Sequence, residues 1–301
     1  MSGGGTMPPM PIRGILLCLA SAAAFGAMGV FGKRAYDEGA TVGTLLAVRF
    51  AVAGLVLGAA AVATGALRGL ARRDVVLAAG LGAIAYSAQA GAYFAALARI
   101  DAGLLSLLVY TFPAIVAVAA AALGRERAGR RTAAALALSS AGLVLVVAGA
   151  GAGALDPLGT TLGLIAACVY AAYVLVSERV AQRLGPLALA ALVCAGAAAT
   201  LTLGAAATGE LRPADVTPAG FGWLVAIALV STVGALALFF AGLSLVGPTA
   251  ASILSTAEPV TAVVLAFAVL GDTLGPVQLA GGALVLAAAT VLSLARPQEQ
   301  P

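Results

Sequence analysis

The stretch YFAALARIDAGLLSLLVYTFPAIVAVAAAALGRERAG, residues 93–129, has a second version later in the chain. A shift of 146 positions places it on FFAGLSLVGPTAASILSTAEPVTAVVLAFAVLGDTLG, residues 239–275. The matched pairs include Pro113 with Pro259, Ser106 with Ser252, Phe94 with Phe240, and Glu126 with Asp272. Alanine-rich helices often match one another by chance, but coincident proline, serine and acidic positions are rare. The pattern therefore indicates two copies of one unit.

Composition places both copies in a membrane. Of the 301 residues, 62% are apolar and 9% are charged, and the mean hydropathy is +1.10. Soluble domains are about half apolar and about one quarter charged, so the chain is predicted to be an all-α membrane protein. The net charge of +4 is too small and too dispersed to indicate a nucleic-acid partner.

Metal and cofactor chemistry has no support in the sequence. The chain has no histidine, and its cysteines lie in apolar segments without CxxC spacing, at Cys18, Cys168 and Cys194. We interpret the cysteines as packing residues and expect neither a metal nor a cofactor. Most intramembrane hydrolases need histidine or clustered acids, so we also expect no enzymatic activity.

Ten apolar runs are long enough to cross the ~30 Å hydrocarbon core of a bilayer as helices. They span 14–32, 41–63, 75–97, 102–123, 132–150, 158–177, 186–207, 220–243, 248–270 and 276–295. The predicted fold is two inverted five-helix repeats, 12–150 and 156–296, with disordered tails at 1–11 and 297–301. A signal peptide is an alternative for the first run, because Arg13 precedes the small residues ASA at 20–22. The unbroken continuation to Gly32 and the repeat both favour a retained helix.

Lysine and arginine residues in the loops predict the orientation. Eleven fall on the side of the N-terminus and four on the opposite side, so both termini are expected in the cytoplasm. Because five is an odd number, the second repeat then enters the membrane in the opposite direction to the first. Inverted repeats of this kind hold a binding site near the midplane and permit alternating access.

This organisation resembles a known family. The segments that carry the resemblance are FPAIVAVAAAALGRE (112–126), EPVTAVVLAFAVLGD (258–272) and VRFAVAGLVL (48–57). They are similar to the EamA family of the drug/metabolite transporter superfamily, over roughly residues 12–296. Asp272 stands where that family usually has Glu, which retains the charge. The resemblance implies a transporter of amino acids, other metabolites or drugs, without identifying which.

Glu258 and Pro259 interrupt an apolar run about ten residues into the predicted ninth helix. A carboxyl group at that depth is costly, and it is either held in a fixed pair or hydrogen bond, or it serves as a proton or cation-substrate site. Pro259 removes one helical hydrogen bond and frees the carbonyl of Ser255, one turn earlier. Carboxyl, carbonyl and hydroxyl groups are thereby predicted to converge on a cationic or amino-bearing ligand.

Arg49 lies about eight residues into the predicted second helix, near 12 Å from its start at the helical rise of ~1.5 Å. Three interpretations remain open. The side chain extends to the interface and anchors the helix, or it pairs with Glu258, or it binds an anionic group of the substrate.

Further polar residues lie at helical spacing inside the apolar runs. They are Ser106, Tyr110 and Pro113 in the fourth run, Ser252, Thr256 and Pro259 in the ninth, Tyr86, Gln89 and Tyr93 in the third, and Tyr170 and Tyr173 in the sixth. Each set falls on one helix face, which suits helices that line a cavity, although prolines used only for kinked packing and tyrosines used as interfacial anchors give the same pattern. Gly26, Gly29 and Gly32 predict a close-packing face in the first helix.

These features predict a secondary active transporter, most directly an exporter of small organic metabolites such as amino acids. An uptake carrier and a multidrug exporter of the same superfamily are the alternatives, and a non-transporting structural protein would leave the inverted repeat unexplained. No GxxxxGK[ST] motif occurs, so the energy is expected from protons or the membrane potential. The expected location is the plasma (inner) membrane, and the expected partners are the bilayer lipids and a small-molecule substrate.

Overall fold

The computed structural model describes residues 12–123, 130–149 and 156–295, and every regular element in these ranges is a helix. The predicted tails at 1–11 and 297–301, and Glu126, lie outside the described residues. The helices of the first half are α1 (Ile12–Gly26), α2 (Met28–Asp37), α3 (Val42–Ala63), α4 (Arg72–Leu81), η1 (Gly82–Tyr86), α5 (Ser87–Leu97), α6 (Ala102–Val109), α7 (Phe112–Ala122) and α8 (Arg130–Gly149). Those of the second half are α9 (Pro157–Leu184), α10 (Pro186–Ala207), η2 (Pro213–Asp215), α11 (Pro218–Ala228), η3 (Leu229–Gly234), α12 (Ala235–Ser255), α13 (Ala257–Leu265), η4 (Ala266–Leu270) and α14 (Pro276–Ala295).

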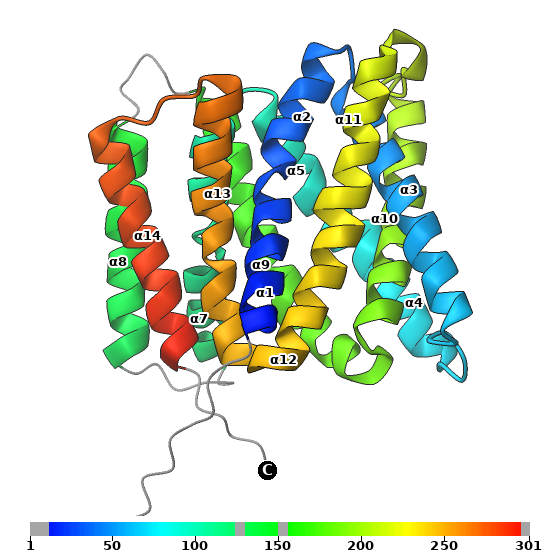
Figure 1. Ribbon diagram of the computed structural model, residues 1–301, viewed down its shortest axis with the longest axis horizontal. Coiled ribbons are helices and arrows are strands. Elements are labelled where there is room, and N and C mark those ends of the chain that lie inside the picture. Colours follow the sequence, from blue (N-terminus) through cyan, green and yellow to red (C-terminus); the bar gives the residue numbers. More distant parts are fainter. Residues whose placement is uncertain (1–11, 124–129, 150–155, 296–301) are drawn as a thin grey trace, which may run out of the picture.

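The long helices stand side by side (Figure 1). Eight helical segments of the described chain are long and apolar enough to cross a membrane, and two further apolar helices, Ala133–Gly149 and Pro276–Val291, are shorter. The all-helical prediction is confirmed for the described residues. Two predicted boundaries differ, because α9 continues to Leu184 and because α12 remains helical across the expected turn between the eighth and ninth runs.

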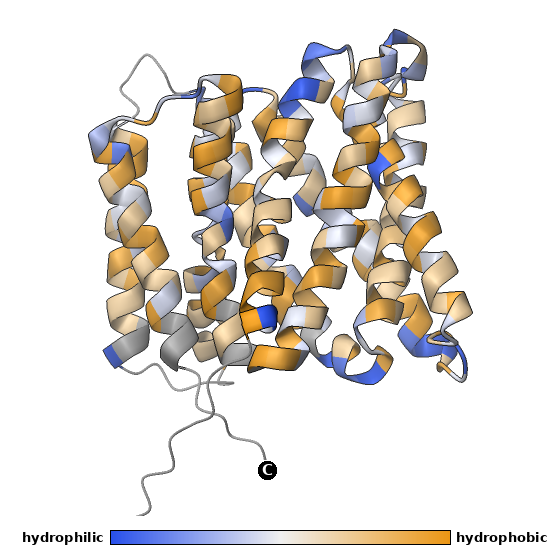
Figure 2. Cartoon of the chain, viewed as in Figure 1, coloured by the Kyte–Doolittle hydropathy of each residue, from blue (hydrophilic) through white to orange (hydrophobic). Residues whose placement is uncertain are grey.

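Apolar residues cover most of the length of the helices, and hydrophilic residues concentrate at their ends (Figure 2). Large apolar side chains also face outward. Leu55 is 74% exposed and Ile84 is 76% exposed. Such an outer surface suits contact with lipid, in which the helices satisfy their own backbone hydrogen bonds.

The packing pairs link the two halves in a regular way. The strongest partners are α1 with α12, α5 with α9, α3 with α10, and α8 with α14. The 146-residue shift converts the pair α1 with α12 into the pair α9 with α5. It leaves the pairs α3 with α10 and α8 with α14 unchanged, because the two members of each pair change places. The packing therefore follows the sequence repeat.

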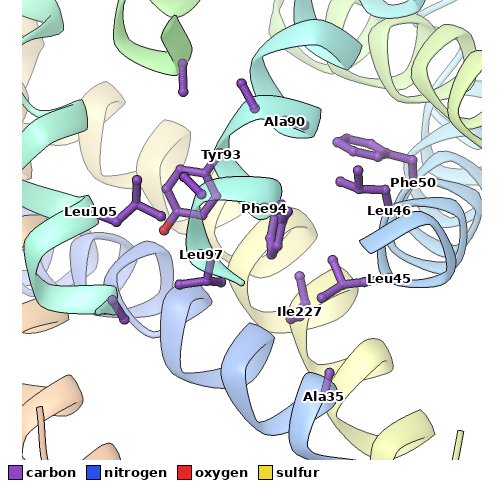
Figure 3. Close-up of a cluster of buried hydrophobic side chains, with 14 of the residues drawn as sticks. Ala35, Leu45, Leu46, Phe50, Ala90, Tyr93, Phe94, Leu97, Leu105 and Ile227 are labelled. Atoms are coloured by element: carbon purple, nitrogen blue, oxygen red, sulfur yellow. The ribbon is translucent and has the colours of Figure 1, made fainter. Parts of the chain in front are cut away.

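Glycine lets α1 and α2 approach their neighbours closely. A Cβ atom on Gly26 would lie 2.7 Å from the Glu258 carbonyl oxygen, and one on Gly32 would lie 2.6 Å from a methyl carbon of Leu97. Gly29 lies between them and faces Ala102. Phe50, Tyr93, Phe94 and Leu97 belong to the adjoining buried cluster, to which helices from both halves contribute (Figure 3).

Two helices contain a π-helical turn at matching places in the repeat. η1 lies between α4 and α5, and η3 lies between α11 and α12. In each turn or directly after it, a hydroxyl group donates to the carbonyl five residues earlier, Ser87 to Gly82 at 2.8 Å and Thr232 to Ile227 at 3.0 Å. π-Turns are rare in proteins and occur frequently at functional sites.

Candidate functional site

Both proline-bearing spans are broken at the same position of the repeat. α6 ends at Val109 and α7 begins at Phe112, so that Pro113 is the second residue of the new helix. In the second half, α12 ends at Ser255 and α13 begins at Ala257, two residues before Pro259. The two breaks fall at residues 110–111 and 256, which the 146-residue shift superimposes.

One hydrogen bond joins the two breaks. The Tyr110 hydroxyl donates to the carbonyl oxygen of Ser255 at 3.0 Å. That carbonyl lies four residues before Pro259, whose ring nitrogen has no proton to offer it. The Ser255 carbonyl, which the sequence analysis predicted to be free, therefore accepts a hydrogen bond from Tyr110 in the first half. The hydroxyls of Ser255 and Thr256 instead donate within their own helix, to Ala251 and Ile253.

The carboxyl group of Glu258 lies beside this connection. The side chain lies within the helix bundle and is only partly buried. Among the described residues, no hydrogen bond or ion pair with this carboxyl group is found. Its charge is therefore not neutralised by a basic partner in the described part of the chain.

Arg49 is 4% exposed and stays inside the protein. Its Nε donates to Thr232 Oγ1 at 3.1 Å, and its guanidinium carbon lies 5.0 Å from the ring centre of Phe50 and 5.3 Å from that of Phe94. The side chain therefore does not extend to the membrane interface. It also forms no ion pair with Glu258, so two of the three interpretations of Arg49 do not describe this conformation.

A chain of aromatic rings connects the surroundings of Arg49 with those of Glu258. Neighbouring ring centres are 5.6 Å apart for Phe50 and Tyr86, 5.1 Å for Tyr86 and Tyr173, 6.1 Å for Tyr173 and Tyr170, 4.6 Å for Tyr170 and Phe112, and 5.9 Å for Phe112 and Tyr110. The rings come from α3, η1, α9, α7 and the break between α6 and α7. Edge-to-face and offset contacts at these separations are favourable.

The tyrosines also locate the two charges relative to one another. Tyr86 and Tyr93 lie within electrostatic reach of both Arg49 and Glu258. Tyr110 and Tyr170 lie within reach of Glu258. Both residues therefore lie in the same part of the bundle, among helices of the first and second halves.

The remaining sequence candidates are less closely connected. The side chains of Gln89 and Ser106 are partly buried and have no hydrogen bond with a described residue, and the side chain of Ser252 lies outside the described residues. The residues that the sequence argument missed are Phe50, Phe94, Phe112 and Thr232. Phe112 could have been found, because the 146-residue shift places it on Glu258.

Two grooves on the bundle do not contain the charged pair. One, of about 710 Å³, lies between α3, η1, the start of α5 and α10, and the other, of about 390 Å³, lies between α7, α8 and α9. Neither is lined by Arg49 or Glu258. Within the described residues, no cluster of three or more His, Cys, Asp or Glu could hold a metal ion.

Comparison with known proteins gives this architecture a family. The model of the EamA-like transporter family matches the chain twice, over residues 12–148 and 157–294. The chain belongs to the EamA-like transporter family. The two matches correspond to the two halves, and together with the apolar helices they make this protein an integral membrane protein of a transporter family.

Two known proteins are similar to this EamA-like transporter. It is 34% identical over 150 residues to a protein named "Uncharacterized transporter YwfM" from Bacillus subtilis (strain 168), and the match covers 48% of each chain. The chain therefore spans about half the length of this curated relative. A solved structure described as "Crystal structure of protein" covers 93% of this chain and 96% of its own, with a TM-score of 0.65 at 21% identity. That likeness supports the fold alone.

Proposed function

We propose that this EamA-like transporter is a secondary active exporter of small organic metabolites such as amino acids, and that the substrate binds between the two halves. The observation that carries the proposal is a buried basic group and a carboxyl group that form no ion pair with any described residue. Arg49 comes from the first half and Glu258 from the second. The chain of aromatic rings runs from Phe50, beside Arg49, to Tyr110, which bonds the Ser255 carbonyl three residues before Glu258. Buried charges are costly in a membrane and are retained where they bind something.

The two charges suit the two ends of a zwitterion. The guanidinium group of Arg49 offers donors to a carboxylate, and the carboxyl group of Glu258 accepts from an ammonium group or takes up a proton. The rings between them offer apolar and cation–π contacts to the rest of the molecule. Glu258 is also the group that couples transport to protons in this proposal.

Alternating access follows from inverted repeats. The proposed topology has ten transmembrane helices with both termini in the cytoplasm of a cell with a plasma (inner) membrane. The packing pairs that map onto one another under the repeat support this, as does the unequal distribution of Lys and Arg over the loops. The two broken helices then lie at the centre of the bundle, where small rotations open one side and close the other.

Counterflow into proteoliposomes tests the proposal. Vesicles loaded with a high concentration of one unlabelled amino acid should transiently accumulate the same labelled amino acid, because a carrier exchanges its substrate and a channel does not. Candidates come from an overexpressing strain with altered tolerance to amino acids and toxic analogues. Increased tolerance supports export, and greater sensitivity would favour an uptake carrier. Altered tolerance to unrelated cationic drugs would favour a multidrug exporter, and no exchange of any candidate would contradict the transport proposal.

A further inference from the structure

Thr232 contacts the charge of Arg49 from the π-turn η3. Its oxygen accepts the hydrogen bond from Arg49 Nε at 3.1 Å, and its own hydroxyl proton goes to the Ile227 carbonyl at 3.0 Å. Thr232 is 3% exposed, so both bonds are shielded from solvent. Because the proton is already donated, the oxygen can only accept from the arginine, which fixes its role.

The π-turn makes this arrangement possible. Other threonines in the helices donate to the carbonyl three or four residues earlier, as Thr111 does to Leu108, Thr261 to Ala257 and Thr290 to Leu286. Thr232 reaches the fifth carbonyl back, which the wider π-turn brings under the side chain. A regular α-helix would present a different carbonyl and a different side-chain direction toward α3.

Thr232 engages only one of the three guanidinium nitrogens. The terminal nitrogens of Arg49 have no hydrogen bond with a described residue. Within the described chain, the fully enclosed side-chain polar atom without a partner is Ser231 Oγ, so the terminal nitrogens of Arg49 retain some accessible surface. Thr232 is neutral, and the arginine charge therefore remains available to an anion.

The matching π-turn in the first half holds no charge. Ser87 donates to Gly82, again five residues back, but η1 lies directly against the backbone of α10. A Cβ atom on Gly82 would lie 2.0 Å from the Val193 carbonyl oxygen, and one on Gly196 would lie 2.0 Å from that of Ala79. The π-turn of the first half therefore packs against the backbone of α10, whereas the π-turn of the second half binds the side chain of Arg49.

We propose that Thr232 is a positioning residue, which with the π-turn η3 holds the Arg49 guanidinium by its Nε so that its two terminal nitrogens stay free to receive a carboxylate. This rests on the proposed function, in which Arg49 binds the anionic end of the substrate. It adds a specific role for Thr232, and it makes the geometry of η3 a determinant of anion recognition.

Arginine labelling tests the geometry without a transport measurement. Phenylglyoxal reacts with the two terminal nitrogens of arginine, and peptide mass spectrometry after digestion follows Arg49 separately from exposed arginines such as Arg99 and Arg183. The full chain, purified in detergent, is compared with Thr232→Val, Thr232→Ser and Thr290→Val. The last variant is the matched control, because it removes a threonine hydroxyl that bonds only within α14.

Thr232→Val removes the hydrogen bonds that the threonine hydroxyl makes with Arg49 Nε and with the Ile227 carbonyl, and these two groups lie close together. The guanidinium is then expected to turn toward that carbonyl, which lowers the labelling rate of Arg49 roughly tenfold or more, as for the loss of one hydrogen bond to a charged group. Thr232→Ser restores the rate, and Thr290→Val and the exposed arginines remain at wild-type values. Millimolar sodium acetate, as a simple carboxylate, should protect Arg49 in wild type more than in Thr232→Val.

An unchanged labelling rate in Thr232→Val, or failure of Thr232→Ser to restore it, overturns the positioning role. If Thr232→Val does not give a monodisperse protein by size-exclusion chromatography, Thr232→Ala carries the same comparison. Counterflow separates this inference from the proposed function. If the expected labelling differences are found but no amino acid is exchanged, the proposed function is contradicted and the positioning role stands. If amino acids are exchanged but Thr232→Val changes neither the KM nor the labelling of Arg49, the positioning role is contradicted and the proposed function stands.

Discussion

The break between α6 and α7 and the break between α12 and α13 have the same backbone arrangement but carry different side chains. Each lies shortly before a proline, at positions that the repeat superimposes. In the first half the residue before the proline is Phe112, which packs on Tyr170, and in the second half it is Glu258, which has no partner among the described residues. The backbone scaffold is duplicated, and the carboxyl group is not.

The same contrast holds for the second charged residue. Arg49 faces Thr232 of η3, whereas the position 146 residues later is Ala195, in the segment where Gly196 meets the backbone of α4. Both charges therefore occur once in a repeated architecture. Symmetry suits a protein whose two sides open alternately, and the unpaired charges suit a ligand that is bound in a single orientation.

The largest expected effect concerns the predicted inverted orientation of the second half relative to the first. Reporter fusions after Arg131 and Arg183 should give cytoplasmic signals, and fusions at Lys33, Asp156 and Asp215 should give external signals. The outcome is all or none for each fusion, because a reporter lies on one side of the membrane. Paired alkaline phosphatase and fluorescent-protein fusions provide the measurement, and a cytoplasmic signal at Asp156 would mean that the second half is not inverted.

Glu258→Gln tests whether the carboxyl group, and not merely a polar side chain, matters at the second break. We expect folded protein in the membrane and a loss of proton-dependent or cation-dependent transport of roughly tenfold or more, since hydrogen bonds to charged groups contribute about 1.5–3 kcal/mol. Uptake into proteoliposomes across a range of pH measures the effect. Glu210→Gln is the control, because Glu210 is exposed and contacts Thr41 and Thr44 through its backbone carbonyl. Wild-type transport and an unchanged pH profile in Glu258→Gln would make Glu258 a structural residue.

Much of the fold was accessible to sequence reasoning because its signals are strong. Apolar runs of membrane length predict helices, and the coincidence of Pro113 with Pro259 predicts a repeat and the two equivalent breaks. The boundaries were less accurate, since α9 continues past its apolar run into a polar turn that ends at Leu184. Composition marks where a helix can contact lipid, and helical hydrogen bonding continues beyond that point.

The site was only partly accessible for a related reason. Glu258, Arg49 and the tyrosines stand out because polar groups are rare in such runs. Phe50 and Phe112 do not stand out, because a phenylalanine in an apolar helix has the same sequence signature whether it faces lipid or a neighbouring tyrosine. Thr232 was missed because its role depends on the π-turn, and nothing in the letters of residues 229–234 distinguishes a π-turn from an α-helix.

Replacing each proline compares the two breaks directly. Pro259→Ala supplies a backbone proton that can bond the Ser255 carbonyl and so displaces the hydroxyl of Tyr110 that joins the halves. We expect turnover to fall a few-fold while stability changes by less than about 1 kcal/mol, since one hydrogen bond replaces another. Pro113→Ala should have a smaller effect, because no bond between the halves is found at the Val109 carbonyl within the described residues. Counterflow rates and thermal unfolding give the two quantities, and equal effects of the two substitutions would remove the distinction between the breaks.

The smallest expected effect concerns two carboxyl groups at helix N-termini outside the membrane-spanning segments. Asp272, from the second half, accepts a hydrogen bond from the Ala102 backbone nitrogen at 3.0 Å, at the start of α6. Asp156 accepts one from the Gly159 nitrogen at 2.9 Å, at the start of its own helix α9. Burial and the nearby carboxylate of Asp101 raise the pKa of Asp272, whereas the hydrogen bond from Gly159 is the main cause that lowers the pKa of Asp156.

The two caps should therefore respond to pH with opposite sign. A carboxyl group with a raised pKa contributes stability below its ordinary pKa and loses that contribution as the pH rises through the raised value. One with a lowered pKa contributes above its ordinary pKa and loses it as the pH falls. Asp272→Asn should thus unfold at a slightly higher temperature than wild type at neutral pH, and Asp156→Asn at a slightly lower one, with both differences fading near pH 3. Thermal unfolding of the purified protein between about pH 3 and pH 8 measures these unfolding temperatures. If both substitutions shift the unfolding temperature in the same direction at neutral pH, burial of the Asp272 carboxylate does not destabilise the protein.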